Sequence, residues 1–280
     1  MNIAEAAKEM NLPKIPCARH SELFLDAKLV EAALSAGEGV SELRRTKKAS
    51  DILTSLKSDG SLVTEADLLS DVMLTQAIKA YYPLHLLISE EGHRQSDIDA
   101  SIPAFIVDPL DGTRNYKEGK SDFAILLARR ESEGLIYGLI HYPEWQLLIE
   151  GHSALGTFAN GSQCWVSDRL KLEDERLHLI HCQAIQDRSF LVGGKESTEA
   201  LIDVAMGLID GAIIRLCGHA IWDFAAGVVA IEAAGGKVTD EKGQPLSFAC
   251  SEFDPTYVVA SNGAVHHELM RLLRDRLISA

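Results

Sequence analysis

Apolar residues recur at helical spacing in several parts of the chain. Residues Ser21–Arg45 show this spacing, with Gly37 and Gly39 near the end of the expected helix. Thr64-Glu-Ala-Asp67 resembles a capped helix start, and this helix is expected to run to about Tyr81 because Pro83 follows. The same spacing predicts three further helices, at Thr198–Leu208, Ile221–Ala234 and Val265–Leu277.

Short apolar runs predict strands between these helices. Leu84–Ser89 and Ala104–Val107 are expected to be buried strands. An antiparallel meander is expected at Phe123–Arg129, Gly134–His141 and Trp145–Glu150. Further strands are expected at Gly211–Leu216, Lys237–Thr239 and Tyr257–Ala260. Because strands and helices mix without strict βαβ alternation, the pattern predicts a layered α/β or α+β fold.

Length and glycine content indicate how the chain divides. A chain of 280 residues with 46% hydrophobic residues can bury a sizeable core as one large domain or two subdomains. The glycine-rich segment Gly151–Gly161 is the best candidate boundary. We therefore expect one subdomain at residues 1–155 and a second at residues 156–280.

Charge and cysteine content exclude several classes of protein. The 41 acidic and 27 basic residues give a net charge of −14, which disfavours binding to a nucleic-acid polymer. The five cysteines form no CxxC motif, so a disulfide framework or zinc knuckle is not expected. No signal peptide and no apolar stretch of about 18 residues occurs, which predicts a cytoplasmic protein without a membrane span.

The strongest chemical signal follows the expected strand Ala104–Val107. In Asp108-Pro-Leu-Asp111-Gly-Thr113, proline fixes the backbone and glycine permits a tight turn. Two aspartates three residues apart can converge on one point, and their oxygens suit a hard cation such as Mg²⁺. The backbone N–H groups of Gly112 and Thr113 can bind phosphate oxygens if a helix starts there.

Other acidic residues stand at the ends of predicted elements. Glu90-Glu91 ends a different buried strand, Asp67 opens a helix, and Asp223 follows Trp222 at the start of another helix. Each alone has a simple structural explanation, such as a turn or a helix N-cap. Together they place carboxylates where they could meet in one cleft.

These segments resemble motifs of the inositol monophosphatase superfamily. The run Asp108–Tyr116 resembles its first signature, DPxDGTxN followed by an aromatic residue. Trp222–Gly227 with Glu232–Gly236 is similar to its second signature, WDxAAG…EAGG. Two smaller motifs match in the segments Lys57…Val63–Asp67 and Ser89–Glu91. Order and spacing agree from about residue 21 to residue 277.

The resemblance implies a layered αβαβα sugar-phosphatase-like sandwich with two or three Mg²⁺ ions per active site. The N-terminal subdomain would carry most of the metal ligands, and the C-terminal one would complete the metal site and the substrate cleft. By this resemblance Glu90, Asp108 and the carbonyl of Leu110 would hold one ion. Asp108, Asp111 and Asp223 would hold a second, and Glu90 would help to bind a weaker third.

The resemblance also implies roles in catalysis. Thr113, supported by Asp67, would orient and deprotonate the attacking water, with Glu90 in the same catalytic set. Gly112 and Thr113 would hold the phosphate, and Asp111 would border the substrate together with Asp223. The implied activity is Mg²⁺-dependent hydrolysis of a small phosphorylated alcohol, such as inositol monophosphate, by a homodimer.

The sequence departs from the family pattern on the substrate side. Arg215 stands near the position where inositol-specific members carry an acidic residue, and Lys195 lies before the following helix. Both are candidate contacts for a second phosphate. A 3′(2′),5′-bisphosphate nucleotidase acting on adenosine 3′,5′-bisphosphate therefore stays open, as do fructose bisphosphate and histidinol phosphate. The roles of Lys57 and His219 are also open.

Two other kinds of protein remain alternatives. Haloacid-dehalogenase-like phosphatases carry an Asp-x-Asp-Gly-Thr run and form an aspartyl-phosphate, but here two residues separate the aspartates. A non-enzymatic protein that kept the metal-binding scaffold is the other alternative. The complete set of acids with Thr113 favours an enzyme.

Overall fold

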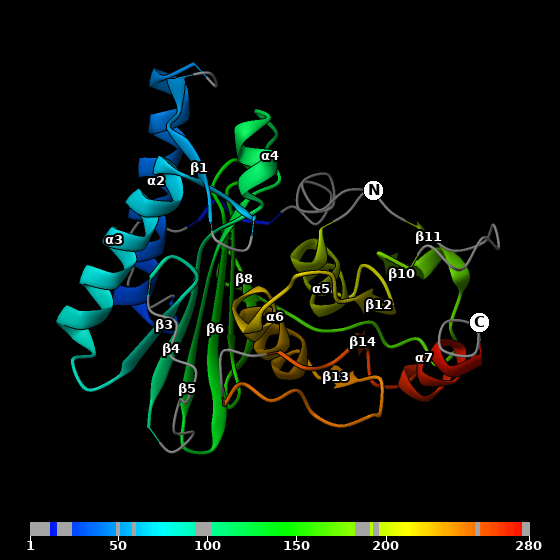
Figure 1. Ribbon diagram of the computed structural model, residues 1–280. Helices are drawn as coiled ribbons and strands as arrows, with labels where there is room; N and C mark the ends of the chain where they lie inside the picture. Colours follow the sequence, from blue (N-terminus) through cyan, green and yellow to red (C-terminus); the bar gives the residue numbers. More distant parts are fainter. Residues whose placement is uncertain are drawn as a thin grey trace.

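The computed structural model describes residues 12–15, 24–48, 51–57, 60–92, 102–182, 191–192, 196–249 and 253–275. Five layers follow one another across the molecule (Figure 1): two helices, a large sheet, two helices, a smaller sheet and a last helix. This arrangement confirms the predicted layered fold.

The first layer is a pair of helices, α2 (Ala27–Thr46) and α3 (Glu65–Tyr81). Asp26 caps α2 by accepting a hydrogen bond from the N–H of Leu29, and Thr64 with Asp67 forms a capping box for α3. Apolar side chains of both helices pack on one face of the large sheet, against residues such as Phe105. The short hairpin β1 (Thr54–Leu56) and β2 (Leu62–Thr64) leads into α3.

The large sheet has seven strands in the order β3-β4-β5-β6-β7-β8-β9. Only β3 and β4 are parallel, and each later strand pairs antiparallel with its predecessor. A five-residue helix, α4 (Thr113–Lys117), follows β4. The strands are β3 (Leu86–Ser89), β4 (Ala104–Asp111), β5 (Ala124–Glu131), β6 (Gly134–Tyr142), β7 (Leu147–His152), β8 (Gly156–Ala159) and β9 (Ser162–Cys164).

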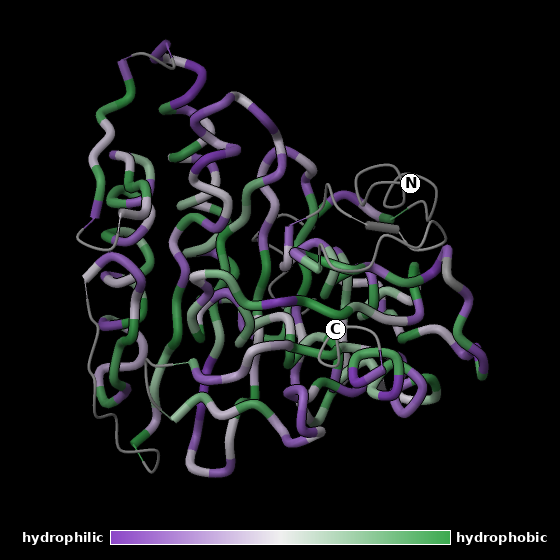
Figure 2. The backbone as a smooth tube through the Cα atoms, turned by 45° about the vertical axis from the view of Figure 1, so that its right-hand side comes forward, coloured by the Kyte–Doolittle hydropathy of each residue, from purple (hydrophilic) through white to green (hydrophobic). Residues whose placement is uncertain are grey.

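The middle layer, α5 (Ser197–Ala205) and α6 (Ile221–Ala233), lies between the two sheets. The second sheet has the order β11-β10-β12-β14-β13. A 3₁₀ turn, Asp174–Arg176, precedes it, and α7 (His266–Leu273) covers its outer face. Figure 2 shows hydrophobic stretches along the strands and inner helices. The strands are β10 (Leu177–Ile180), β11 (Leu191–Val192), β12 (Gly211–Arg215), β13 (Lys237–Asp240) and β14 (Tyr257–Ser261).

The predicted boundary at residue 155 falls between β7 and β8. Both β8 and β9 stay hydrogen-bonded to the large sheet, which therefore runs to Cys164. The two-subdomain division stays a prediction. Cys164, Cys182 and Cys217 are free thiols, whereas Cys17 and Cys250 lie outside the described residues. Among the described helices, none combines the length and the apolar composition needed to cross a bilayer.

Candidate active site

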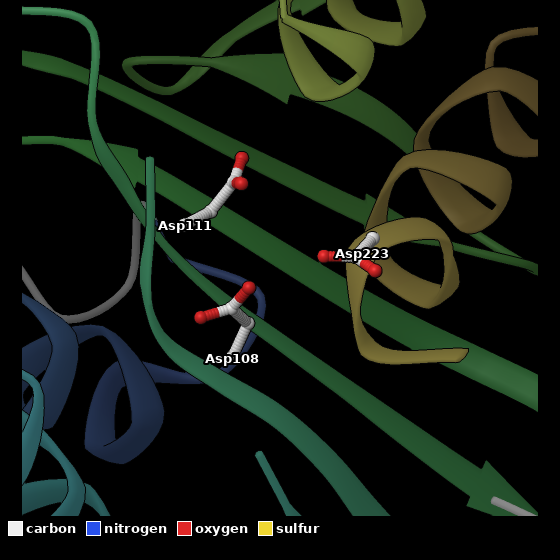
Figure 3. Close-up of side chains that lie close together, drawn as sticks. All are labelled: Asp108, Asp111 and Asp223. Atoms are coloured by element: carbon white, nitrogen blue, oxygen red, sulfur yellow. The ribbon is translucent and has the colours of Figure 1, made fainter. Parts of the chain in front are cut away.

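Asp108 and Asp111 stand at the end of β4, where the strand leaves regular pairing. The register with β5 shifts between these two residues, which marks a bulge. Both side chains border the space between β4 and α6 (Figure 3). Asp108 is 1% exposed, and its Oδ1 accepts a hydrogen bond of 3.0 Å from the N–H of Leu110. The turn expected directly after Val107 is therefore absent: the run Asp108–Asp111 stays in β4 with a shift of register, and the turn follows at Gly112.

Asp223 approaches the same point from the first turn of α6. Its Oδ2 accepts a hydrogen bond of 2.5 Å from the N–H of Ala220, which fixes the carboxylate at the helix start. One oxygen each of Asp108, Asp111 and Asp223 lies within 4.8 Å of the others. Figure 3 shows the three side chains facing a common space between β4 and α6. Residues more than 100 positions apart therefore form one cluster of carboxylates.

The three aspartates bring carboxyl groups together at a site where Asp108 is buried and the other two are half-buried. Burial first, and then the charges of Glu90, Asp111 and Asp223, raise the pKa of Asp108 well above its usual range. Burial and the charge of Asp111 act in the same way on the pKa of Asp223. The pKa of Asp111 rises to about 7, chiefly through burial. Such a cluster favours a bound cation, because a cation would let all three carboxylates ionise.

Glu90, Glu91 and Lys57 border the cluster at the end of β3. The Lys57 Nζ atom lies 2.6 Å from Glu90 Oε1 and 2.5 Å from Glu91 Oε1. Burial raises the pKa of Glu91 to about 7, against the opposing effect of Lys57. The carboxyl of Glu90 is also hydrogen-bonded to Asp108. Lys57 therefore compensates part of the negative charge on the β3 side.

Thr113 and Asp67 form a hydrogen-bonded pair beside the aspartates. Thr113 Oγ1 donates to Asp67 Oδ1 at 2.7 Å and lies 3.1 Å from the Leu110 carbonyl oxygen. The other oxygen of Asp67 accepts a hydrogen bond of 2.8 Å from the N–H of Thr64. Burial raises the pKa of Asp67, although these hydrogen bonds oppose the shift. One carboxylate thus serves as a helix cap and as the partner of Thr113.

Gly112 connects β4 to α4 in a conformation that requires glycine. Its φ is 81°, and a Cβ atom would lie 2.8 Å from the backbone oxygen of Asp122. Its N–H donates to the carboxylate of Asp111. The predicted contact of Gly112 with a phosphate stays a prediction.

Comparison with known sequences assigns the chain to a family. The sequence model of the inositol monophosphatase family matches residues 24–277. The chain belongs to the inositol monophosphatase family. It is accordingly a phosphatase.

Relatives of known name match three quarters or more of this chain. An inositol-1-monophosphatase of Mesorhizobium japonicum is 30% identical over 266 residues, covering 89% of this chain and 96% of the relative. A fructose-1,6-bisphosphatase/inositol-1-monophosphatase of Thermotoga maritima is 27% identical, covering 76% and 83%. The structure of an inositol monophosphatase from Anabaena (Nostoc) matches with a TM-score of 0.70 at 27% identity, covering 90% and 96%.

In this inositol monophosphatase family member, residues at the start of α5 also contact the aspartate cluster. Thr198 is hydrogen-bonded to Asp111. Ser197 Oγ lies 2.9 Å from His219 Nε2, and Asn115 Nδ2 donates to Glu196 Oε1 at 2.9 Å. The sequence analysis missed Glu196, Thr198 and Asn115 as site residues. Asn115 stands in the run that resembles DPxDGTxN, and Glu196-Ser-Thr198 stands where a helix was expected to begin, but neither pattern was assigned a role in the site.

His219 is hydrogen-bonded through both ring nitrogens. Its Nδ1 accepts a hydrogen bond of 3.1 Å from the N–H of Cys217, so Nε2 carries the proton that it donates to Ser197. Burial, together with the charge of His181, lowers the pKa of His219 to about 4. Both ring nitrogens are therefore engaged, and the ring is neutral near pH 7.

Of the two basic residues predicted to contact the substrate, the structure describes Arg215 but not Lys195. Arg215 ends β12 with an exposed side chain, and its charge acts on Cys182 and Tyr257. The charges acting most on Asp223 are those of other residues, including Lys57. The substrate contact of Arg215 stays a prediction. Lys195 lies outside the described residues.

Proposed function

We propose that the protein is a Mg²⁺-dependent phosphomonoesterase that hydrolyses a small phosphorylated alcohol, such as inositol monophosphate, by direct in-line attack of water. The observation that carries the proposal is the meeting of Asp108, Asp111 and Asp223 within 4.8 Å, next to the hydrogen-bonded pair of Thr113 and Asp67. We also propose that the protein is a homodimer in the cytoplasm.

The donor atoms fit hard divalent cations. They are carboxylate and carbonyl oxygens, without the sulfur and imidazole ligands that zinc prefers. Glu90, Asp108 and the carbonyl of Leu110 would hold one ion, and Asp108 would share a second with Asp111 and Asp223. Glu90 would contribute to a weaker third. When bound, such ions neutralise phosphate charge, favour ionisation of water and stabilise the leaving oxygen.

Thr113 and Asp67 would handle the proton of the attacking water in this proposal. Because the Thr113 hydroxyl donates to Asp67 at 2.7 Å, the lone pairs of its oxygen can accept a hydrogen bond from water. As the water oxygen forms its bond to phosphorus, its proton passes to Thr113 Oγ1, and the hydroxyl proton of Thr113 passes to Asp67. A carboxylate with a raised pKa is a better proton acceptor near neutral pH than an exposed one.

Water displaces the alcohol directly in this scheme, so phosphorus forms no bond to an aspartate. The P–O bond to the alcohol breaks, and the departing oxygen gains its proton from solvent. This distinguishes the proposal from the haloacid-dehalogenase-like alternative, in which an aspartyl-phosphate accumulates.

Replacing Asp111 with Asn tests the proposal. The amide keeps the shape of the side chain but removes a charged ligand, so we expect kcat/KM to fall by about a hundredfold or more. The measurement is phosphate release with and without Mg²⁺ from inositol 1-phosphate, adenosine 3′,5′-bisphosphate, fructose 1,6-bisphosphate and histidinol phosphate. Chelation with EDTA should abolish activity in the wild type, and Mg²⁺ should restore it.

The control variant is Glu118→Gln, which changes an exposed carboxylate paired with Lys120 at 2.8 Å. It should retain wild-type turnover. Near-normal activity of Asp111→Asn would contradict the assigned role of Asp111. A trapped phosphoenzyme would favour the aspartyl-phosphate mechanism, and absence of hydrolysis across the whole panel would favour a non-enzymatic protein.

A further inference from the structure

Glu196 stands at the rim of the aspartate cluster in a fixed position. It is the N-cap residue of α5, is exposed, and accepts a hydrogen bond of 2.9 Å from Asn115 through Oε1. Its charge acts on Asp111. Among the residues that the structure describes, Asn115 donates a hydrogen bond to Oε1 of this carboxylate, so Oε2 can accept one from a ligand.

The two neighbours of Glu196 along the chain explain why it is held there. Ser197 is hydrogen-bonded to His219, which precedes α6, and Thr198 is hydrogen-bonded to Asp111. Three consecutive residues therefore contact α4, the start of α6 and the end of β4. Lys120 Nζ contacts Asn115 Oδ1 at 3.2 Å and pairs with Glu118 at 2.8 Å, so its charge is already partly matched.

The geometry of in-line displacement puts the alcohol on the side of Glu196. Thr113 and Asn115 are two residues apart on α4, so their side chains leave the helix in nearly opposite directions. Thr113 points to Asp67 on α3, and Asn115 points to Glu196 before α5. Water held by Thr113 would attack from the α3 side, and the leaving oxygen departs on the opposite side of phosphorus.

A carboxylate on that side selects the chemistry of the alcohol. It accepts hydrogen bonds from hydroxyl groups and repels a second phosphate. We propose that Glu196 is a specificity-determining residue that binds a hydroxyl group of a polyol phosphate and disfavours bisphosphate substrates. The proposal rests on the proposed phosphomonoesterase function, because it assigns the alcohol part of that substrate.

Two phosphate esters of the same ring size test the substrate class on the wild-type protein. Inositol 1-phosphate carries hydroxyl groups around its ring, and cyclohexyl phosphate carries none. We expect kcat/KM to be at least about tenfold higher for inositol 1-phosphate, since one hydrogen bond to a charged group is worth about that factor. It should also exceed kcat/KM for adenosine 3′,5′-bisphosphate. This comparison needs no substitution and does not depend on the folding of a variant.

The variant Glu196→Gln assigns the effect to this residue. It should raise KM for inositol 1-phosphate by about tenfold, with kcat nearly unchanged. Its kcat/KM for cyclohexyl phosphate should equal that of the wild type. Glu196→Lys should improve hydrolysis of adenosine 3′,5′-bisphosphate relative to inositol 1-phosphate. Glu173→Gln, which removes an exposed charge paired with Arg169 at 2.7 Å, should alter none of these ratios.

The outcomes separate this inference from the proposed function. If the wild type hydrolyses none of the esters with Mg²⁺, the phosphomonoesterase function itself fails. If it hydrolyses them but prefers the bisphosphate, the polyol assignment is overturned. Equal effects of Glu196→Gln on inositol 1-phosphate and cyclohexyl phosphate would overturn the specificity role, because a general loss of structure or charge acts on both substrates.

Discussion

His141 lies on β6 with 4% of its surface exposed, and its Nδ1 atom is 3.3 Å from the carbonyl oxygen of Leu147. Burial lowers the pKa of His141 from 6.5 to about 4. Between these two values the unfolded chain binds a proton that the folded protein does not bind. Protonation therefore favours the unfolded chain. The contribution of His141 to the unfolding free energy is highest above pH 6.5 and falls as the pH is lowered toward 4.

Replacing His141 with Gln tests this assignment. Between pH 7 and pH 5 the wild type should lose about 2 kcal/mol of unfolding free energy through this residue, and His141→Gln should lose that much less. Urea unfolding in the presence of EDTA at both pH values measures the difference. His267→Gln, at an exposed position on α7, should keep the wild-type pH dependence. A wild-type pH dependence in His141→Gln would contradict the prediction.

Single residues differ in how far the sequence reveals their surroundings. The Thr64–Asp67 capping box was predictable because both partners lie within one helical turn. Asp108, Asp111 and Asp223 were predicted to share a cleft because each stands at one end of a strongly patterned element, and their carboxylates do lie together. Glu196 was missed because its partner Asn115 lies 81 positions away, and no local spacing connects them.

Two glycines of α2 have different surroundings. A Cβ atom on Gly37 would lie 2.6 Å from His141 Nε2 and 2.9 Å from Pro143 Cγ. A Cβ atom on Gly39 would lie 3.3 Å from Met73 Sδ, the far part of a flexible side chain. Gly37 therefore allows α2 to pack closely on the β6–β7 hairpin, whereas a Cβ atom on Gly39 requires only a small shift of the flexible Met73 side chain.

The variants Gly37→Ala and Gly39→Ala should change stability in opposite directions. Alanine in a helix interior gains about 0.5–1 kcal/mol over glycine, which Gly39→Ala should largely keep. Overpacking at Gly37 costs about 1–3 kcal/mol, so Gly37→Ala should be destabilised. Unfolding by urea measures both, and each variant is the control for the other. Equal stabilisation of the two would show that the hairpin yields to the added methyl group.

At the scale of elements, the local pattern predicted whether a segment is helix or strand better than it predicted where the segment ends or which strand it pairs with. The helices at α3, α5 and α6 and the meander β5–β6–β7 were predicted close to their observed ranges. The strand predicted to end at Val107 runs on to Asp111 because a bulge keeps the chain paired with β5. The strand β8 was missed because it lies inside the predicted boundary segment Gly151–Gly161, which is short, rich in glycine and weakly patterned. The strand β9, which follows directly, has only three residues.

At the scale of the whole molecule, α6 packs between the two sheets and carries Asp223 to the site. The order β11-β10-β12-β14-β13 joins strands far apart in the chain, which no local periodicity can reveal. Gly138 of β6 and Gly151 of β7 face each other in register. A Cβ atom on Gly138 would lie 2.7 Å from the backbone oxygen of Ala226. On Gly151 it would lie 2.9 Å from Ala230 Cα. This glycine pair sets how closely α6 approaches the large sheet.

The distance from Asp223 to Asp108 and Asp111 depends on that close approach, because α6 carries Asp223 and the sheet carries the other two. Gly138→Ala should push the backbone of α6 away and cost about 1–3 kcal/mol of stability. It should also raise the Mg²⁺ concentration needed for half-maximal phosphate release, while saturating Mg²⁺ restores part of the turnover. Gly39→Ala, on the opposite helical layer, should leave the Mg²⁺ dependence unchanged. Wild-type Mg²⁺ dependence in a destabilised Gly138→Ala protein would show that the position of Asp223 does not depend on this contact.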